Sequence, residues 1–340
     1  MASAMRGLDM ESLSMGKLRG LQQLANSGGI FVICAMDHRG SLQKMLNEEQ
    51  PKAVSYRTMV DYKLDLCRTL APYASAVLLD PVYGAAQAIA AGVLPGTTGL
   101  LVSMEATGYA GDRERRLTEL QPHWSVEKLK RLGASAVKLL LYYRPDLRDI
   151  ASKQLDLVKR LADECMRVDI PLLVEPKSYP IGRREGDPQE FARVKPQLVI
   201  ETAEHITAQH IDVLKAEFPA DLNYEKDKVR LFNLCQQLDK ASRVPWVILS
   251  AGVDFELFSE EVEIACRAGA SGFLAGRALW QEAAHIRSRR ERLKFLETTV
   301  AERLKQLANV ANTYGTPWYT KLGDKKHNLA SISEGWYQTY

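Results

Sequence analysis

Lys138, Glu175 and Lys215 are ionisable residues that stand inside otherwise apolar, strand-like stretches of the sequence. An amine attacks a carbonyl only when it is unprotonated, and an ordinary lysine is almost fully protonated at neutral pH. Burial and a second nearby cation both lower a lysine pKa, which is how lysines that form Schiff bases are activated. Two lysines with a carboxylate between them supply a nucleophile, a cation that tunes it and a proton shuttle. The pattern predicts covalent carbonyl chemistry, with structural ion pairs as the alternative for any single residue.

Two glycine-containing segments that follow Lys215 in the sequence could bind an anion. Residues 250–253 read Ser-Ala-Gly-Val and residues 275–278 read Ala-Gly-Arg-Ala, and each follows an apolar run. Glycines let backbone N–H groups approach an anion, and a helix N-terminus adds a favourable dipole. Ordinary turns are the alternative interpretation. We favour a phosphate site, and its candidate ligands are Ser250, Gly252, Gly276 and Arg277.

A regular succession of strands and helices must position these residues. Short apolar runs rich in β-branched residues predict strands, and stretches of helical period separate them. The predicted strands are Ile30–Asp37, Ala76–Asp80, Gly99–Glu105, Ala136–Tyr143, Pro171–Pro176, Val213–Phe218, Trp246–Ala251 and Gly272–Arg277. The predicted helices are Leu18–Asn26, Ile150–Val168, Pro188–His210, Lys226–Ala241, Glu256–Ala268 and Trp280–Ala308.

Repeated strand–helix–strand units require a parallel sheet with right-handed crossovers. Eight such units favour an α/β fold of the (β/α)8 TIM barrel type, which takes roughly 250 residues plus extensions; an open, doubly wound sheet is the alternative. We expect an N-terminal extension with a helix over residues 1–28, a catalytic barrel over 29–310 and a C-terminal tail over 311–340. The aromatic tail is expected to pack on the barrel or on a partner subunit.

Each predicted strand carries a polar residue, at or next to its end in six strands and within the strand for Lys138 and Lys215. In chain order they are Asp37, Asp80, Glu105, Lys138, Glu175, Lys215, Ser250 and Arg277. In a closed barrel the carboxyl ends of the strands meet at one mouth, where active sites are built. Buried charges are costly unless they are paired or used in chemistry. We therefore expect these residues to line a functional mouth.

Composition narrows the function classes. The chain has 45 Lys and Arg against 42 Asp and Glu, for a formal charge of +3, and 46% hydrophobic residues. These values exclude a disordered or fibrous chain and give no reason to expect nucleic acid or a membrane as partner. The N-terminus lacks a signal-peptide pattern, and the apolar runs are too short to span a bilayer. We expect a cytoplasmic protein.

The cysteines and histidines give no indication of a metal site. The five cysteines are scattered and form no Cys-x-x-Cys pair, so neither a disulfide framework nor a thiolate site is indicated. The six histidines include no His-x-x-x-His pair, and only His38 lies near a predicted strand end. We expect catalysis without a metal or other cofactor.

Six segments together resemble a known family, the class I tagatose-1,6-bisphosphate aldolases of bacteria. The similarity covers about residues 18–308, and the order of the motifs is more specific than any one of them. The matching segments are Ala35–Leu42 (AMDHRGSL), Ala136–Tyr143 (AVKLLLYY), Leu172–Pro176 (LLVEP), Asp212–Glu217 (DVLKAE), Leu249–Val253 (LSAGV) and Gly272–Ala278 (GFLAGRA).

The resemblance implies a TIM barrel that splits a ketose phosphate into dihydroxyacetone phosphate and an aldehyde without metal. In the family pattern Lys215 matches the Schiff-base lysine, Glu175 the acid/base carboxylate and Lys138 the second lysine. Asp37 matches the acidic residue of the first strand. The phosphate-binding segments of the family match Ser250, Gly252, Gly276 and Arg277.

One position departs from the family pattern. The family usually has Gln after the acidic residue of the first strand, and this chain has His38. Both side chains can hydrogen-bond a sugar hydroxyl, but histidine also titrates near neutrality. This leaves open the identity of the sugar or of its far end. A related group cleaves sulfofructose phosphate, in which a sulfonate replaces the second phosphate.

The main hypothesis is a class I aldolase that cleaves a ketohexose bisphosphate such as tagatose 1,6-bisphosphate to dihydroxyacetone phosphate and glyceraldehyde 3-phosphate. A sulfofructose-1-phosphate aldolase that yields sulfolactaldehyde is one alternative. A non-catalytic sugar-phosphate sensor is another, although it would not need both lysines and the carboxylate. A deoxyribose-phosphate aldolase or transaldolase type of Schiff-base enzyme fits the order of motifs less well. The expected partners are the phosphorylated ketose and further copies of the chain in a homo-oligomer.

Overall fold

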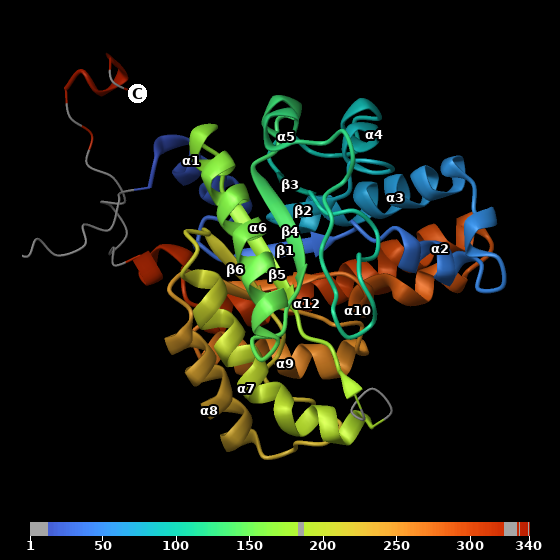
Figure 1. The fold of residues 1–340 in the computed structure, drawn as a ribbon. Coiled ribbons are helices and arrows are strands. Elements are labelled where there is room, and N and C mark those ends of the chain that lie inside the picture. Colours follow the sequence, from blue (N-terminus) through green and yellow to red (C-terminus); the bar gives the residue numbers. More distant parts are fainter. Residues whose placement is uncertain (1–12, 183–186, 323–331, 333, 339) are drawn as a thin grey trace, which may run out of the picture.

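Eight runs of apolar residues form parallel strands that close into a barrel in chain order, β1 pairing with both β2 and β8 (Figure 1). The computed structural model describes residues 13–182, 187–322, 332, 334–338 and 340. The strands are β1 (Phe31–Ala35), β2 (Ala76–Leu79), β3 (Gly99–Ser103), β4 (Ala136–Tyr142), β5 (Leu172–Lys177), β6 (Val213–Ala216), β7 (Trp246–Leu249) and β8 (Gly272–Ala275). The expected (β/α)8 barrel is confirmed.

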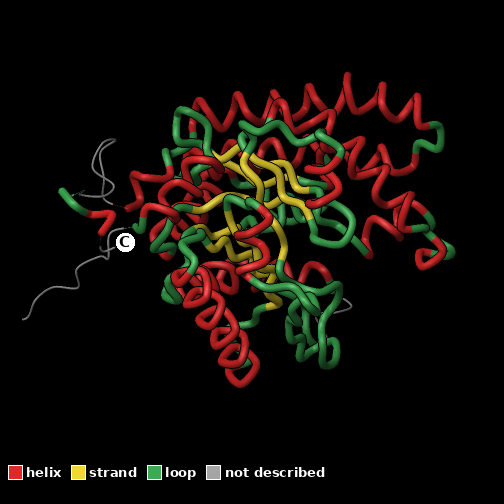
Figure 2. Tube along the Cα trace, turned by 90° about the horizontal axis from the view of Figure 1, so that it is seen from above, coloured by secondary structure: helices red, strands yellow, loops and turns green. Residues whose placement is uncertain are grey.

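Helices surround the strands, as the view from above shows (Figure 2). The α-helices are α1 (Met15–Leu24), α2 (Gly40–Leu46), α3 (Tyr56–Leu70), α4 (Ala85–Ala90), α5 (Val126–Leu132), α6 (Arg148–Arg167), α7 (Pro188–Thr207), α8 (Lys228–Ala241), α9 (Phe255–Arg267), α10 (Arg277–Trp280), α11 (Arg289–Phe295) and α12 (Ala301–Tyr314). Side chains of Ser or Asp cap the N-termini of α3, α5, α7, α8 and α9, as expected for helix starts. The sequence predicted α1 and α6–α9 to within a few residues and missed α2–α5.

The single helix predicted over Trp280–Ala308 is wrong. The chain leaves α10 through a short 3₁₀ segment and starts a new helix after Ser288, whose side chain accepts a hydrogen bond from the Glu291 N–H. A π-helical stretch at Leu296–Val300 then joins α11 to α12. The sequence showed the apolar period but not the break, because the cap at Ser288 interrupts a pattern that is helical on both sides.

Seven of the eight strands end earlier than predicted, whereas β5 extends one residue further to Lys177, so most of the polar residues of the mouth lie just beyond the strand ends. Asp37 and Asp80 follow β1 and β2, and Glu105 follows β3. Ser250 is the first residue after β7, and Arg277 begins α10 rather than ending β8. Lys138, Glu175 and Lys215 lie within their strands as predicted. Parallel pairing stops where the staggered strands of the barrel lose their neighbours, which apolar character alone does not reveal.

Side chains along each strand point alternately into the barrel and out of it. A closed apolar layer includes Ala136, Leu173 and Val213, and α1 with Trp318 packs beneath it at the end opposite the mouth. Two residues further along the same strands come Lys138, Glu175 and Lys215. Strand alternation therefore carries these three side chains into the layer directly above the apolar floor.

The C-terminal tail begins inside a helix, because α12 continues through Ala311 to Tyr314. Trp318 of the tail is buried against the barrel, which agrees with the expected packing of the tail on the barrel. Three other aromatic residues of the tail, Trp336, Tyr337 and Tyr340, are exposed. Residues 1–12, 323–331, 333 and 339, which belong to the predicted extension and tail, lie outside the described residues.

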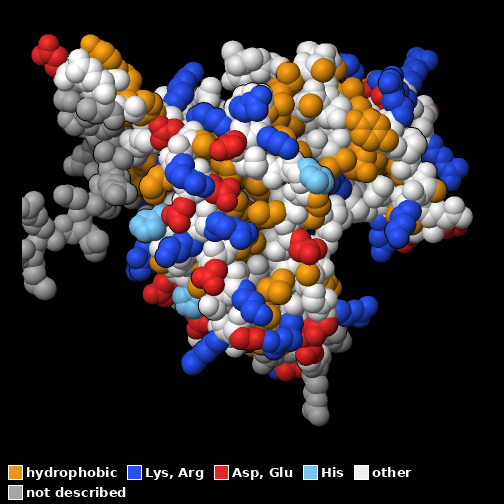
Figure 3. Space-filling model, turned by 45° about the horizontal axis from the view of Figure 1, so that its top comes forward, with side chains coloured by type: hydrophobic (Ala, Val, Ile, Leu, Met, Phe, Trp, Pro, Cys, Tyr) orange, Lys and Arg blue, Asp and Glu red, His pale blue; other side chains and the backbone are white. Residues whose placement is uncertain are grey.

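The outer surface shows no single-signed face in the view of Figure 3, where Lys and Arg alternate with Asp and Glu. This mixture agrees with the small formal charge of +3. No helix in the described part of the chain is long and apolar enough to cross a membrane.

Candidate active site

Lys138 of β4 lies at the centre of the charged layer. Its Nζ is 2.9 Å from Asp37 Oδ2, 2.8 Å from Glu105 Oε1 and 3.0 Å from Glu175 Oε2, and its side chain is 1% exposed. Burial opposes the charged form, but the attraction of Asp37, Glu105 and Glu175 outweighs it and raises the pKa of Lys138 well above its usual value. Lys138 is therefore a fixed cation that holds three carboxylates together.

Lys215 of β6 lies in a different environment although it is also buried. Its Nζ is 2.8 Å from Glu175 Oε2, and no other acidic group of the described residues lies within ion-pair distance. Burial lowers the pKa of Lys215, and the nearby Lys138 cation lowers it further, against the attraction of Glu175 and Asp37. Lys215 is thus the lysine that loses its proton more easily, which is what a nucleophilic amine requires.

The carboxylates stay ionised between the lysines. Burial alone would raise the pKa of Glu175, but Lys138 and Lys215 lower it to about 2. Burial likewise opposes ionisation of Asp37, and the nearby cations, Lys138 first, hold its pKa below its usual range. One Glu175 oxygen contacts both lysine nitrogens, so this carboxylate can carry a proton to and from a group bonded to Lys215.

Glu105 was expected in the ring of polar residues but was not assigned to the site. Besides its ion pair with Lys138, its second oxygen accepts a hydrogen bond from the Leu140 N–H at 3.0 Å. Arg39, which the sequence analysis left unassigned, donates to the Glu105 carbonyl oxygen at 2.6 Å and to Gln121 Oε1 at 2.9 Å. Both residues hold the β3 end of the mouth in place, and the pairing of Glu105 with a residue 33 positions away gave no local signal in the sequence.

His38 lies between the charged layer and the phosphate segments. Its ring meets the Trp280 ring edge-on at 5.1 Å between centroids, and Nδ1 is buried without a hydrogen-bond partner in the described structure. Burial lowers the pKa of His38 to about 3, and the cations Arg277, Lys63 and Lys215 add to this effect against Asp37. A neutral imidazole can exchange hydrogen bonds with a sugar hydroxyl but does not carry charge at neutral pH.

The two glycine segments come together beside His38. Ala251 and Gly252 have φ values of +48° and +87°, and the Val253 N–H closes the turn on the Ser250 carbonyl at 3.0 Å. This left-handed pair suits glycine at the second position, and the non-glycine at the first stores strain of the kind that gathers at binding sites. A Cβ on Gly252 would lie 2.9 Å from Arg277 Cζ, so the glycine lets the guanidinium lie against the turn.

Arg277 and Gly276 complete this corner of the mouth. Arg277 Nη2 donates to the Ala251 carbonyl at 3.3 Å, which leaves other donors of its planar fork for an anion. A Cβ on Gly276 would lie 2.7 Å from His38 Cε1 and 3.1 Å from the Ala35 carbonyl oxygen. The helix that follows, α10, has only four residues. The expected dipole contribution is therefore small, and the backbone N–H groups and Arg277 remain as the donors.

Comparison with known proteins bears on what this arrangement does. The family model described as DeoC/LacD family aldolase matches residues 31–282. Tagatose 1,6-diphosphate aldolase 1 of Enterococcus faecalis is 35% identical over 288 residues, 80% of this chain and 86% of that protein. Tagatose 1,6-diphosphate aldolase of Staphylococcus haemolyticus is 33% identical over 325 residues, 91% of this chain and 99% of that protein.

The chain belongs to the DeoC/LacD aldolase family. The family expected from the motifs is confirmed, and the protein is an aldolase, a lyase that breaks or forms a carbon–carbon bond. Solved structures share the fold at lower identity. An archaeal fructose 1,6-bisphosphate aldolase superposes with a TM-score of 0.56 at 22% identity, over 84% of this chain and 98% of that one. Fructose-bisphosphate aldolase of Plasmodium falciparum gives 0.67 at 15%, over 87% and 94%.

Two further charged residues support the mouth of this aldolase. Lys63 of α3 is 1% exposed, donates to the Met36 carbonyl oxygen at 2.6 Å and pairs with Asp80 at 2.5 Å. Asp80 also accepts hydrogen bonds from the N–H groups of Val82 and Tyr83. Asp80 is therefore a structural member of the ring, and Lys63 anchors the backbone just before Asp37. Lys63 was not predicted as a site residue, because α3 was not among the helices expected from the sequence.

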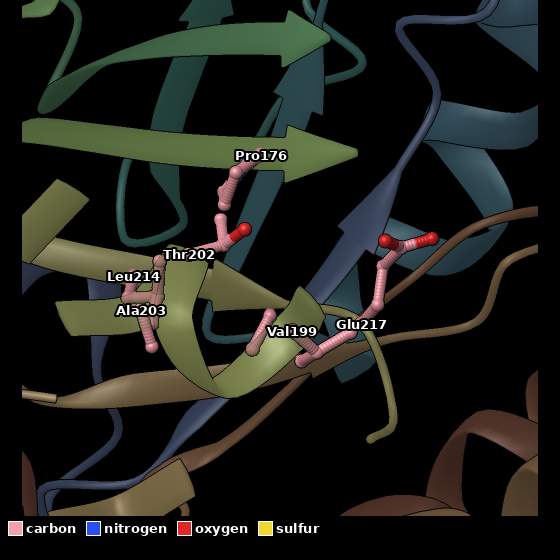
Figure 4. A pocket seen from close by; sticks show the side chains of 7 residues that line it. Pro176, Val199, Thr202, Ala203, Leu214 and Glu217 are labelled. Carbon is pink, nitrogen blue, oxygen red and sulfur yellow. The ribbon is translucent and has the colours of Figure 1, made fainter. Parts of the chain in front are cut away.

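The hollows of the aldolase differ in what they can hold. A cavity of about 10 Å³ lies between β5, β6 and α7, and Figure 4 shows the Glu217 carboxylate pointing away from its other lining residues. This space fits about one water molecule. An open hollow of about 810 Å³ lies beside Arg277, lined by residues of α2 and by Ala284, His285 and Arg287. It falls in the range of ~300–1,000 Å³ typical of small-molecule sites, and it adjoins the phosphate corner.

The described residues of the aldolase contain no cluster of three or more His, Cys, Asp or Glu side chains arranged to hold a metal ion. His205 of α7 contacts the Tyr143 hydroxyl through Nδ1 at 2.9 Å on the outside of the barrel. The five cysteines are all buried and unpaired.

Proposed function

We propose that this aldolase cleaves a ketohexose bisphosphate such as tagatose 1,6-bisphosphate into dihydroxyacetone phosphate and glyceraldehyde 3-phosphate through a Schiff base on Lys215. The observation that carries the proposal is the contrast between two buried lysines. Lys138 is fixed as a cation by three carboxylates, whereas Lys215 has one carboxylate partner and a lowered pKa. The relatives named as tagatose 1,6-diphosphate aldolases support the choice of substrate.

The reaction begins with addition of the neutral Lys215 Nζ to the C2 carbonyl of the ketose. The nitrogen loses a proton to the adjacent Glu175 carboxylate, 2.8 Å away, and the C2 oxygen takes up a proton from solvent. Glu175 returns that proton to the C2 hydroxyl, which leaves as water and gives an iminium ion. The fixed charge of Lys138 keeps Glu175 acidic enough to exchange protons without remaining protonated.

Cleavage follows because the iminium ion is an electron sink. A carboxylate removes the proton of the C4 hydroxyl, the C3–C4 bond breaks, and its electron pair moves through C2 to the iminium nitrogen. The products are the aldehyde and an enamine on Lys215. Protonation of the enamine at C3 and hydrolysis of the resulting iminium ion release dihydroxyacetone phosphate and restore the amine.

The remaining candidate residues hold the substrate in this proposal. Ser250, Arg277 and the backbone N–H groups near Gly252 and Gly276 bind the phosphate on C1. Neutral His38, whose Nδ1 lies 3.7 Å from Asp37 Oδ1 and has no hydrogen-bond partner in the described structure, hydrogen-bonds a hydroxyl of the sugar. Asp37, 2.9 Å from Lys138, holds the Lys138 ammonium group in place.

Borohydride trapping tests the covalent step. With dihydroxyacetone phosphate present, reduction of the iminium ion should attach one substrate unit, and peptide mapping should place it on Lys215. Lys138→Arg, which keeps the charge at the centre of the network, should still form the adduct, and Lys215→Arg should not. An adduct on another lysine, or an enzyme that chelators inactivate and zinc restores, would overturn the proposal.

Turnover separates the aldolase from a sugar-phosphate sensor built on the same barrel. A sensor would bind ketose bisphosphates without releasing an aldehyde, which a coupled assay for glyceraldehyde 3-phosphate detects directly. The presence of both lysines and Glu175 favours the enzyme, since binding alone requires no low-pKa amine. The cytoplasmic location and the homo-oligomeric state remain predictions, which fractionation and light scattering of the full chain can test.

A further inference from the structure

We propose that Arg116, held in a cage of three tyrosines at the mouth of the barrel, binds the anionic group at the far end of the ketose. The far end is the one that leaves as the aldehyde. This inference rests on the proposed function and adds to it the residue that selects a second anion, either a phosphate or a sulfonate.

The tyrosine cage consists of Tyr109, Tyr142 and Tyr179. The guanidinium carbon of Arg116 lies 4.9 Å, 5.6 Å and 4.5 Å from the centroids of these rings, respectively. Tyr142 meets each of the other two rings edge-on, at 5.1 Å and 6.3 Å between centroids. Arg116 Nε donates to the Arg113 carbonyl oxygen at 2.8 Å, which fixes one side of the guanidinium.

The cage orders the Arg116 charge without neutralising it. Within the described part of the chain no acidic side chain pairs with Arg116, and its guanidinium donates a hydrogen bond there only through Nε. Aromatic faces attract a cation but, unlike a carboxylate, do not occupy its N–H donors. The two terminal nitrogens therefore keep the planar fork that matches a phosphate or sulfonate. The half-buried position of Arg116 makes such a contact stronger than one in open water.

Strand alternation places the cage over the reacting groups. Tyr142 stands on the same face of β4 as Lys138, four residues closer to the mouth. Burial raises the pKa of Tyr142; Arg116 lowers it, and the Glu105 and Glu175 carboxylates raise it. The phenol therefore lies within electrostatic reach of Arg116 on one side and of the carboxylate network on the other.

The order of strands gives the direction in which the ketose must extend. Lys215 is on β6, which lies two strands from β8 and two strands from β4 around the closed barrel. The proposed C1-phosphate donors follow β7 and β8. A ketose bonded to Lys215 at C2, with its C1 phosphate toward β8, therefore sends C3–C6 toward β4. Arg116 is a cation on that side, and its terminal nitrogens donate no hydrogen bond within the described part of the chain.

Substrate pairs that differ only at C6 test this role. Arg116→Ala should lower kcat/KM for a ketohexose 1,6-bisphosphate about 10- to 100-fold, the loss expected for a charge-assisted hydrogen bond. The matching ketohexose 1-phosphate should change less than about twofold, because it has no C6 anion to lose. Arg116→Lys should retain part of the activity on the bisphosphate, since it keeps the charge but lacks the fork. A 6-sulfo analogue, assayed in parallel, identifies which anion the wild-type enzyme prefers.

Arg115→Ala is the matched control, because Arg115 is adjacent and exposed and pairs with Asp149 outside the cage. It should leave both substrates unchanged. Equal losses on the bisphosphate and the monophosphate in Arg116→Ala, or no loss on either, would overturn the inference. Trapping of dihydroxyacetone phosphate on Lys215 needs no C6 group and should remain intact in Arg116→Ala. Absence of that adduct in the wild-type protein would instead refute the proposed function itself.

Discussion

Replacing Lys138 with Met removes the fixed cation next to the proposed nucleophile. Both lysine nitrogens contact the same Glu175 oxygen, at 3.0 and 2.8 Å, so they lie no more than about 6 Å apart. Two unit charges at that distance repel by about 2.8 kcal/mol when the effective dielectric constant is about 20. This energy corresponds to about 2 pKa units. Lys138→Met should therefore raise the pKa of Lys215, and by less where the freed carboxylates take up protons.

The rate of borohydride trapping with dihydroxyacetone phosphate, followed as a function of pH, measures this shift. The rate should rise as Lys215 loses its proton, and the inflection should move to higher pH in Lys138→Met. Lys138→Arg keeps the charge and should leave the inflection in place, and Lys128→Met removes an exposed lysine as a control for surface charge.

Stability needs a parallel check, because Lys138→Met leaves three buried carboxylates without their shared partner. Loss of one partner of a buried pair costs about 3–5 kcal/mol, so thermal unfolding must show that the variant is folded at the assay temperature. A folded Lys138→Met variant with an unmoved inflection and unchanged turnover would refute the electrostatic argument and reduce Lys138 to a structural ion-pair partner.

Four further outcomes follow from the structure. Glu175→Gln should still bind dihydroxyacetone phosphate but lose a factor on the order of 10²–10⁴ in kcat, the usual range for an acid/base group; full activity would remove Glu175 from the mechanism. Arg277→Ala should weaken binding of dihydroxyacetone phosphate by about 1.5–3 kcal/mol and leave dihydroxyacetone almost unaffected, as titration calorimetry would show. Gly276→Ala should raise KM for the ketose, since the added Cβ would lie 2.7 Å from His38 Cε1; an unchanged KM would mean that the His38 ring moves without consequence. Burial raises the pKa of the Glu261 carboxyl from 4.5 to about 8. The protonated carboxyl therefore contributes fully to the free energy of unfolding below about pH 4.5, and this contribution is lost as the pH rises toward 8. Thermal unfolding should therefore show a decline in wild-type Tm between pH 5 and pH 8 that Glu261→Gln reduces.

The sequence by itself determined the approximate positions of the strands and the places of Lys138, Glu175 and Lys215 within them. Strand alternation is a local property, so the apolar runs around Lys138, Glu175 and Lys215 sufficed to place all three on one face of adjacent or next-adjacent strands. The glycines at residues 252 and 276 likewise indicated places where the backbone lies close to a side chain, Arg277 for Gly252 and His38 for Gly276. The same runs, in their order along the chain, carried the family resemblance.

The roles of the charges depend on the tertiary structure. Lys138 and Asp37 are 101 residues apart, and only barrel closure brings them to 2.9 Å. The assignment of one lysine as fixed cation and the other as low-pKa amine follows from how many carboxylates each one meets, which no local pattern encodes. The neutral state of His38 and the tyrosine cage of Arg116 also arise from contacts between distant segments. Local patterns fix which side chains point inward, whereas electrostatic environment depends on the neighbours that the closed barrel supplies.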